Sequence, residues 1–205
     1  MRTTPTTKQA GRLTIYAGPM MSGKTTALIA ELQDSLEDGN RVLVIKPSID
    51  NRFSDEDVIS HDGVSLQKHT GHFVHRIQTD SFPSQELLTN IDVLLVDEIQ
   101  FFGPHFPEKI EEVLLSGIDV IAVGLDLDSE GKPFKIMPEL LSIANSVFKL
   151  VGICSVCGEV TATRTFRKLS ASSTEQVLIG GAETYEPRCL THWVQGQEEK
   201  LRFFN

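Results

Sequence analysis

The residues best suited to chemistry in this chain begin with a glycine-rich loop at positions 18–25, which reads GPMMSGKT. A short β-prone run precedes it and a helical pattern follows, the context in which G-x-x-x-x-G-K-T binds a nucleoside triphosphate. Backbone N–H groups of such a loop surround phosphate oxygens, and the helix N-terminus adds partial positive charge. The expected phosphate-binding residues are Gly18, Ser22, Gly23, Lys24 and Thr25, with Lys24 reaching the β- and γ-phosphates of ATP and Thr25 coordinating Mg²⁺.

Two consecutive carboxylates follow a buried apolar run at residues 93–96. Asp97 would emerge at the carboxyl end of a strand, where the ligands of α/β proteins gather. It is expected to hold Mg²⁺ directly or through water. Glu98 is then available for a different role. It would polarise a water in an ATPase, or accept the proton of an acceptor hydroxyl in a small-molecule kinase.

All the cysteines of the chain contribute to two short pairs of metal-ligand type. Cys154 and Cys157 form C-x-x-C, and Cys189 and His192 form C-x-x-H. Three thiolates and one imidazole are a ligand set for tetrahedral Zn²⁺, and with every position filled by protein the site is expected to be structural. The zinc would close the polar loop 158–188, which is too polar to fold alone.

The elements that must position these groups follow an alternating pattern. Strands are expected at residues 13–17, a short β-prone run, and at 42–45, 93–96, 118–123 and 147–151, where continuous apolar runs indicate burial on both faces. Helices are expected at 25–36, 106–115 and 138–144. Such alternation predicts an α/β fold of the P-loop (RecA-like) kind, a mostly parallel sheet with helices on both faces. The long polar connection 47–90 should carry function or a small substructure of its own.

The expected organisation is a disordered leader at 1–12, a P-loop nucleotide-binding domain at 13–150 and a small zinc-binding domain at 151–205. The net charge of −9 leaves no basic excess for broad nucleic-acid or anionic-membrane binding. No apolar run approaches the ~20 residues of a bilayer span, and the polar N-terminus lacks a secretory signal. An odd number of cysteines fits a reducing, cytoplasmic setting with a metal site.

The ordered set of motifs resembles the type II, zinc-containing thymidine kinases. The resemblance spans residues 13–192 and rests on the loop 18–25, on DEIQFF at 97–102, and on IGGAETY at 179–185 between the zinc pairs. Further matching positions are 46–47, 50, 52, 61–62, 124–126 and 132–134. The resemblance implies transfer of the γ-phosphoryl group of ATP to the 5′-hydroxyl of thymidine with Mg²⁺, and a homotetramer.

The resemblance also implies roles for individual residues. Glu98 would be the general base, Arg52 would contact phosphates, and Asp50 would assist near the metal. The substrate would be contacted by Met20, Phe101, Leu125, Ile179, Gly180 and Tyr185. The segment around Ile179 would form a lasso, completing the C-terminal zinc-binding and lasso-loop domain, and would read the base with backbone groups.

One position departs from the family pattern: Ser129 stands where an aromatic residue usually packs against the substrate. Loss of a ring there removes roughly 1–3 kcal/mol of stacking and burial. Either Phe134 or another side chain refills the space, or substrate choice differs. The alternatives are therefore a kinase for another deoxynucleoside such as deoxyuridine, or a RecA-like ATPase with a zinc ribbon, which the acidic net charge disfavours.

Overall fold

The computed structural model describes residues 9–49, 74–168 and 181–204 of the chain. Within them, six strands form one parallel sheet in the order β3-β2-β4-β5-β1-β6. The strands are β1 (Leu13–Ala17), β2 (Val42–Pro47), β3 (Val74–Ile77), β4 (Val93–Val96), β5 (Asp119–Gly124) and β6 (Ser146–Lys149). The predicted α/β fold with a mostly parallel sheet is confirmed.

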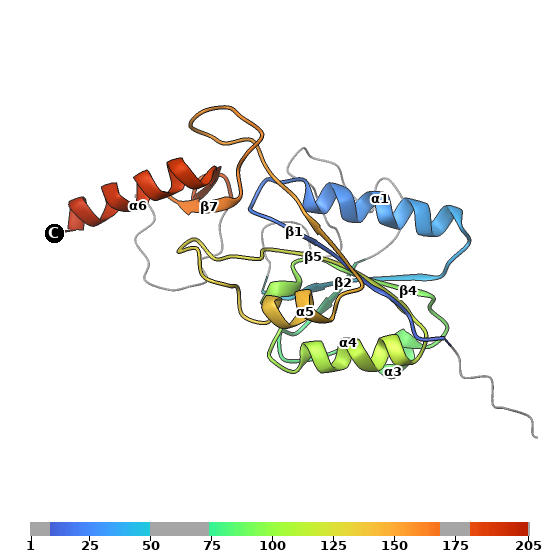
Figure 1. Cartoon of the computed structure of the whole chain (residues 1–205). Helices are drawn as coiled ribbons and strands as arrows, with labels where there is room; N and C mark the ends of the chain where they lie inside the picture. Colours follow the sequence, from blue (N-terminus) through green and yellow to red (C-terminus); the bar gives the residue numbers. More distant parts are fainter. Residues whose placement is uncertain (1–8, 50–73, 169–180, 205) are drawn as a thin grey trace, which may run out of the picture.

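Helices cover both faces of this sheet, as predicted (Figure 1). On one face α1 (Lys24–Glu37) buries Leu28 and Leu32 against β2 and β4, in a cluster with Val44 and Leu95. On the other face α4 (Phe106–Leu115) and α5 (Met137–Ile143) pack in a larger cluster with the short helices α3 (Gln85–Leu88) and η1 (Ile99–Phe101). The central strands are therefore buried on both sides, which explains their uninterrupted apolar sequences.

The segments that follow three of the strands lie at the same end of the sheet, because the carboxyl ends of parallel strands point the same way. The glycine-rich loop at 18–25, named the phosphate loop for its expected role, follows β1, while Asp97 follows β4 and Leu125 follows β5. Strand β5 lies between β1 and β4. The phosphate loop and Asp97 thus leave the sheet two strand spacings apart, roughly 10 Å between backbones.

Two expectations about the strands need correction or addition. The pattern at 147–151 predicts burial on both faces, but β6 is an edge strand in which Val147 is 40% and Phe148 48% exposed. Its apolar character follows instead from stacking of Phe148 on Tyr16 of β1, with ring centroids 4.8 Å apart. The long connection 47–90 contains β3 and α3, but β3 pairs with β2 at one edge of the main sheet and does not form a substructure of its own.

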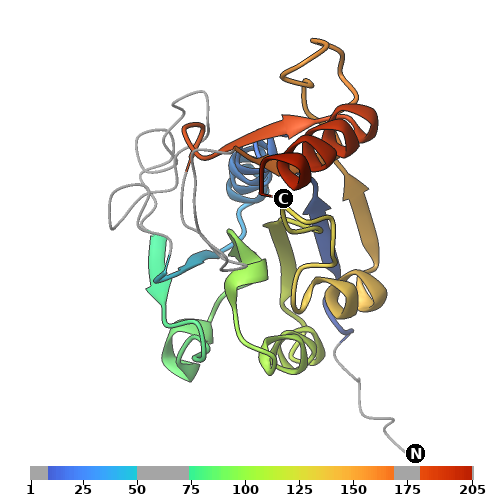
Figure 2. The same ribbon diagram turned by 90° about the vertical axis from the view of Figure 1, so that its left-hand side faces the viewer.

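The C-terminal part forms an antiparallel pair, β7 (Arg164–Arg167) with β8 (Tyr185–Arg188), followed by α6 (Leu190–Phe204). Figures 1 and 2 place this group beyond the edge of the sheet where the phosphate loop lies. The division into domains at residue 150 stays a prediction, as does the disorder expected of residues 1–12, of which 1–8 lie outside the described residues. None of the described helices combines the length and apolar character needed to cross a membrane.

Candidate active site and metal centre

The phosphate loop turns twice through left-handed backbone between β1 and α1. Met21 has φ 58° and Gly23, the residue before the helix, has φ 82°. Glycine is needed at position 18 for a different reason: a Cβ there would lie 2.6 Å from the carbonyl oxygen of Leu150. The loop is therefore backed closely by the chain that leaves β6, which leaves no room for a side chain at its first residue.

The side chains of this loop converge on one carbonyl. Lys24 is buried, and its Nζ donates to the Pro19 carbonyl oxygen over 2.6 Å, while Ser22 Oγ donates to the same oxygen over 2.9 Å. The Lys24 contact holds the ammonium group over the loop, where a phosphate is expected to bind. Thr25 lies in the first turn of α1, directly after the loop, and is half-buried.

The two acids after β4 are held in different ways. Asp97 is 5% exposed, its N–H donates to the Ile45 carbonyl over 2.9 Å, and its Oδ1 accepts the Glu98 N–H over 3.0 Å. Glu98 is half-buried and has φ 48°. A left-handed backbone at a non-glycine residue costs on the order of 1–3 kcal/mol and is found preferentially at functional sites.

Gln100 is a part of this site to which the sequence pattern assigns no role. Its side chain is 0% exposed, and its Nε2 donates to Glu98 Oε2 over 2.5 Å. Its Oε1 accepts the Leu125 N–H over 3.0 Å, and a Cβ at Gly124 would lie 2.6 Å from that oxygen. Gln100 therefore connects the expected base to the chain after β5. A polar amide between Ile99 and Phe101 is the one signal that the sequence offers for it.

The residues expected to contact the nucleoside are only partly brought together. Phe101 packs edge-on against Phe134, with ring centroids 5.7 Å apart, and Leu125 is buried in the same cluster. The Met20 N–H donates to Thr165 Oγ1 over 3.0 Å. Tyr185 is buried in β8, and none of the contacts just named involves it. The expectations for Asp50, Arg52, Ile179 and Gly180 lie outside the described residues.

The turn that contains Ser129 contacts α6. The Ser129 carbonyl oxygen lies 3.3 Å from Trp193 Nε1 and 2.8 Å from Gln197 Nε2. Gly131 has φ 76°, and a Cβ there would lie 2.9 Å from the Trp193 ring. Phe134 is occupied with Phe101, so the ring that lies against this turn is that of Trp193. The tryptophan directly follows the zinc-ligand candidate His192, but no local pattern indicates this contact.

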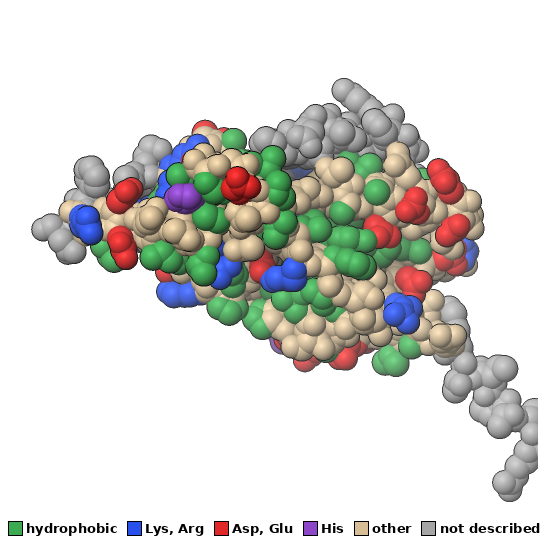
Figure 3. Space-filling model, turned by 45° about the horizontal axis from the view of Figure 1, so that its top comes forward, with side chains coloured by type: hydrophobic (Ala, Val, Ile, Leu, Met, Phe, Trp, Pro, Cys, Tyr) green, Lys and Arg blue, Asp and Glu red, His purple; other side chains and the backbone are tan. Residues whose placement is uncertain are grey.

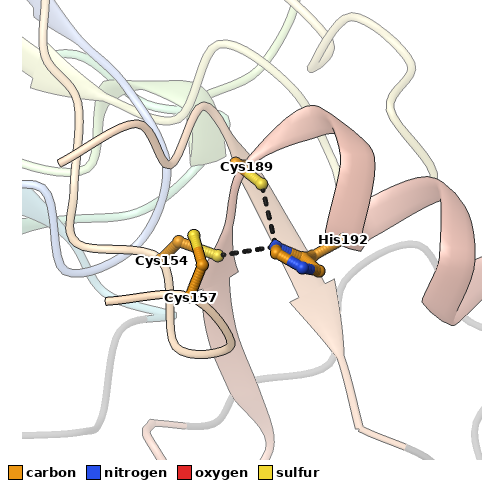
Figure 4. Close-up of side chains that lie close together, drawn as sticks. All are labelled: Cys154, Cys157, Cys189 and His192. Atoms are coloured by element: carbon orange, nitrogen blue, oxygen red, sulfur yellow. Dashed lines mark hydrogen bonds between the residues drawn. The ribbon is translucent and has the colours of Figure 1, made fainter. Parts of the chain in front are cut away.

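The four metal-ligand candidates do come together (Figure 4). Cys154 and Cys157 lie on a turn before β7, and Cys189 and His192 lie at the start of α6. Their ligand atoms are all within 4.8 Å of one another, with His192 Nδ1 3.5 Å from the Cys154 sulfur and 3.1 Å from the Cys189 sulfur. Neighbouring ligands in a tetrahedral zinc site are separated by about 3.5–3.8 Å. The four residues predicted as ligands therefore lie together, and their donor set fits Zn²⁺, while their role as ligands stays a prediction.

The backbone around Cys154 favours a thiolate. Burial raises the pKa of this thiol, but N–H groups of Cys157, Cys189 and Val156 outweigh burial and lower the pKa to about 6. A thiolate is the form that binds a metal. The turn is joined to β8 by the Ser155 N–H, which donates to the Pro187 carbonyl over 2.9 Å. The cluster therefore ties together two segments that lie far apart in the sequence.

Charge is unevenly distributed over the face shown in Figure 3. Acidic side chains gather on the right, at the α1 end, whereas Lys and Arg are more frequent on the left, at the α6 end. The basic residues of β7, β8 and α6 and their flanks are Arg164, Arg167, Lys168, Arg188, Lys200 and Arg202. The same segments also carry Glu183, Glu186, Glu198 and Glu199, and Arg188 is paired with Glu186, so both signs of charge are interspersed at this end.

Comparison with known proteins identifies the family of the chain. The thymidine kinase family profile matches residues 11–193. A thymidine kinase from Deinococcus radiodurans is 41% identical over 196 residues, which cover 91% of this chain and 92% of that protein. Among solved structures, the Pif1 helicase from Candida albicans aligns with 17% identity and a TM-score of 0.38, over 68% of this chain and 36% of the helicase chain. The family profile and the Deinococcus relative show that the chain belongs to the thymidine kinase family.

Proposed function

We propose that this chain transfers the γ-phosphoryl group of ATP to the 5′-hydroxyl of thymidine, releasing ADP and thymidine monophosphate, at the site formed by the phosphate loop and Glu98. Its family makes it an ATP-dependent nucleoside kinase. The observation that carries the residue-level proposal is the strained, half-buried Glu98, which leaves β4 on the same sheet edge as the phosphate loop. A binding loop and a positioned carboxylate are the two parts that phosphoryl transfer to an alcohol requires.

On the phosphate side, the backbone N–H groups of residues 18–25 would bind the triphosphate, and Lys24 would exchange its contact with Pro19 for the β- and γ-phosphates. Thr25 and Asp97 would hold Mg²⁺, which neutralises charge on the phosphates when bound. Arg52 is proposed to contact phosphates, and Asp50 is proposed to assist near the metal.

On the acceptor side, Glu98 would accept the proton of the 5′-hydroxyl of the nucleoside. The 5′-oxygen would form a bond to the γ-phosphorus while the bond between that phosphorus and the bridging oxygen of ADP breaks. Gln100 would keep the carboxylate oriented. The residues proposed to contact thymidine are Met20, Phe101, Leu125, Ile179, Gly180 and Tyr185. An apolar surround with backbone groups reading the base would orient it and exclude water.

The Cys154, Cys157, Cys189 and His192 cluster would hold a structural Zn²⁺. No place is left for a reacting water, so the metal would stabilise the C-terminal segment rather than take part in transfer. A homotetramer, a cytoplasmic location and the absence of nucleic-acid binding are proposed on the family likeness and the net charge of −9.

A panel of nucleosides tests the substrate assignment. Purified protein is incubated with Mg²⁺, γ-labelled ATP and thymidine, deoxyuridine, deoxycytidine or deoxyadenosine, and labelled monophosphates are separated. Thymidine should be labelled with the highest kcat/KM. A higher kcat/KM for deoxyuridine would mean that deoxyuridine is the substrate. ATP hydrolysis on added DNA, with no nucleoside labelled, would contradict the proposed kinase activity.

A further inference from the structure

The zinc-binding end of the chain contacts the phosphate loop through a buried threonine. Thr165 lies in β7 and is 3% exposed, and its Oγ1 accepts the Met20 N–H over 3.0 Å. Close packing accompanies this bond, because a Cβ at Gly152 would lie 3.1 Å from the Met21 carbonyl oxygen. The outer turn of the phosphate loop is therefore held from the β7 side and not only by β1 and α1.

The backbone of the same threonine contacts α6. Trp193 Nε1 lies 3.2 Å from the Thr165 carbonyl oxygen and 3.3 Å from the Ser129 carbonyl oxygen, so one N–H is shared between two acceptors. The shared donor links β7 to the turn that follows β5. Trp193 is one residue beyond His192, and its own backbone N–H donates to the Cys189 carbonyl over 2.9 Å.

A second donor strengthens the contact with the Ser129 turn. Gln197 is one helical turn beyond Trp193 and donates its Nε2 to the Ser129 carbonyl oxygen over 2.8 Å. A carbonyl oxygen has two lone pairs, and α6 supplies a donor for each. Gly131 lets the Trp193 ring lie directly on the turn. The place of the Ser129 turn is therefore fixed by its contacts with α6.

We propose that Thr165 and Trp193 are positioning residues that hold the phosphate loop and the Ser129 turn at a fixed separation, so that zinc at the base of α6 controls ATP affinity. The proposal rests on the ATP-binding role proposed for the phosphate loop. Thr165 contacts Met20 through its hydroxyl oxygen and Trp193 through its carbonyl oxygen. A loop already ordered in its binding conformation avoids the entropic cost of ordering it when the ligand arrives.

Substitutions at Thr165 separate the hydroxyl from the shape of the side chain. Thr165→Val removes the acceptor for the Met20 N–H and keeps the branched shape, and should weaken ATP binding roughly ten-fold, as expected for loss of a buried partner. Thr165→Ser keeps the hydroxyl and should bind ATP within about two-fold of the wild type. Gln195→Ala, at an exposed position of α6, is the matched control. ATP affinity is measured by calorimetry without nucleoside, alongside zinc content and melting temperature.

A second comparison tests the link to the metal. Chelation of zinc should weaken ATP binding in the wild type more than in Thr165→Val, because the variant has already lost the connection. Trp193, the one tryptophan of the chain, should shift its fluorescence to longer wavelength at the same time. If Thr165→Val does not fold, Thr165→Ala replaces it, because it removes the same acceptor for the Met20 N–H, and it should weaken ATP binding about ten-fold likewise.

The outcomes separate this proposal from the proposed function. ATP affinity that is the same in Thr165→Val and the wild type, with zinc retained in both, would overturn the positioning role while leaving kinase activity intact. Equal sensitivity of the two proteins to chelation would overturn the link to zinc. A wild type that phosphorylates no nucleoside would instead contradict the function, and the ATP-binding comparison would still decide the positioning role.

Discussion

Gln100 donates a hydrogen bond from its side-chain amide to the Glu98 carboxylate over 2.5 Å, and this contact fixes where the carboxylate points. The other atom of the amide, Oε1, accepts the Leu125 N–H over 3.0 Å, which prevents the side chain from rotating. Gln100 is fully buried, so water does not compete for either bond. A group that accepts a proton must be held within hydrogen-bond reach of it, and Gln100 supplies that constraint.

Replacement of Gln100 by leucine should therefore impair catalysis and stability together. We expect kcat to fall about ten-fold, and the unpaired Leu125 N–H to lower the free energy of unfolding by about 1–3 kcal/mol. ATP affinity should not change, because Gln100 does not contact the phosphate loop in the hydrogen bonds described. Steady-state kinetics and urea unfolding measure both effects, with Gln195→Leu on the surface as control. An unchanged kcat would remove Gln100 from the site.

The metal centre can be tested by analysis of metal content. The wild type should contain about one zinc per chain, and Cys154→Ser should lose it, since the other three ligands cannot complete a closed tetrahedral site. Val156→Ala changes an exposed residue between the two ligand cysteines and should retain the metal. Zinc at full occupancy in Cys154→Ser would contradict the four-ligand assignment.

Gly196 explains how α6 approaches the antiparallel pair so closely. A Cβ at this position would lie 2.1 Å from Arg188 Nη1 and 2.6 Å from Cε2 of the buried Phe166 ring. Gly196→Ala should lower the free energy of unfolding by roughly 1–3 kcal/mol through overpacking, even though alanine favours a helix. Thermal unfolding beside Gln195→Ala, an exposed neighbour, tests this. A variant as stable as the wild type would show that the ring can move.

Lys200 gives a pH-dependent prediction. Its Nζ lies 4.0 Å from the Phe166 ring centroid, and burial, followed by the charges of Arg167 and Arg188, lowers its pKa from 10.5 to about 8. Between these pH values the unfolded chain binds a proton that the folded chain has released, so stability from this group rises with pH. Below pH 8 the charged ammonium reduces stability by its full amount.

Lys200→Met should therefore raise the free energy of unfolding at pH 7, and its advantage over the wild type should shrink between pH 8 and pH 10.5. Urea unfolding of both proteins across this range measures the difference, in which the other titrating groups cancel. An advantage that is constant with pH would mean that Lys200 keeps its ordinary pKa in the folded protein.

Local patterns are sufficient for the central part of the fold. The runs 13–17 and 93–96 coincide with β1 and β4, and the helix expected at 106–115 coincides with α4. Strand β4 is buried on both faces and has a continuous apolar sequence, which is visible without knowledge of its neighbours. The zinc ligands are equally visible, because spacing alone brings each pair into one turn.

Features that depend on distant neighbours could not be predicted in this way. The half-exposed β3 shows no pattern of its own and becomes a strand by pairing with β2. The exposure of β6 follows from its place at the sheet edge, which composition does not reveal. Thr165 and Trp193 acquire their roles from contacts with Met20 and Ser129, which lie far away in the sequence.

The transfer of label from γ-labelled ATP to thymidine by the wild type and by Glu98→Gln, measured side by side with ATP binding, tests the central claim most directly. Glutamine keeps the shape of the side chain but cannot accept the 5′-hydroxyl proton as a carboxylate does. The wild type should form labelled thymidine monophosphate, and Glu98→Gln should form it about 10²–10⁴-fold more slowly while binding ATP equally well. Equal rates of labelling in the two proteins would contradict the assignment of Glu98 as the base.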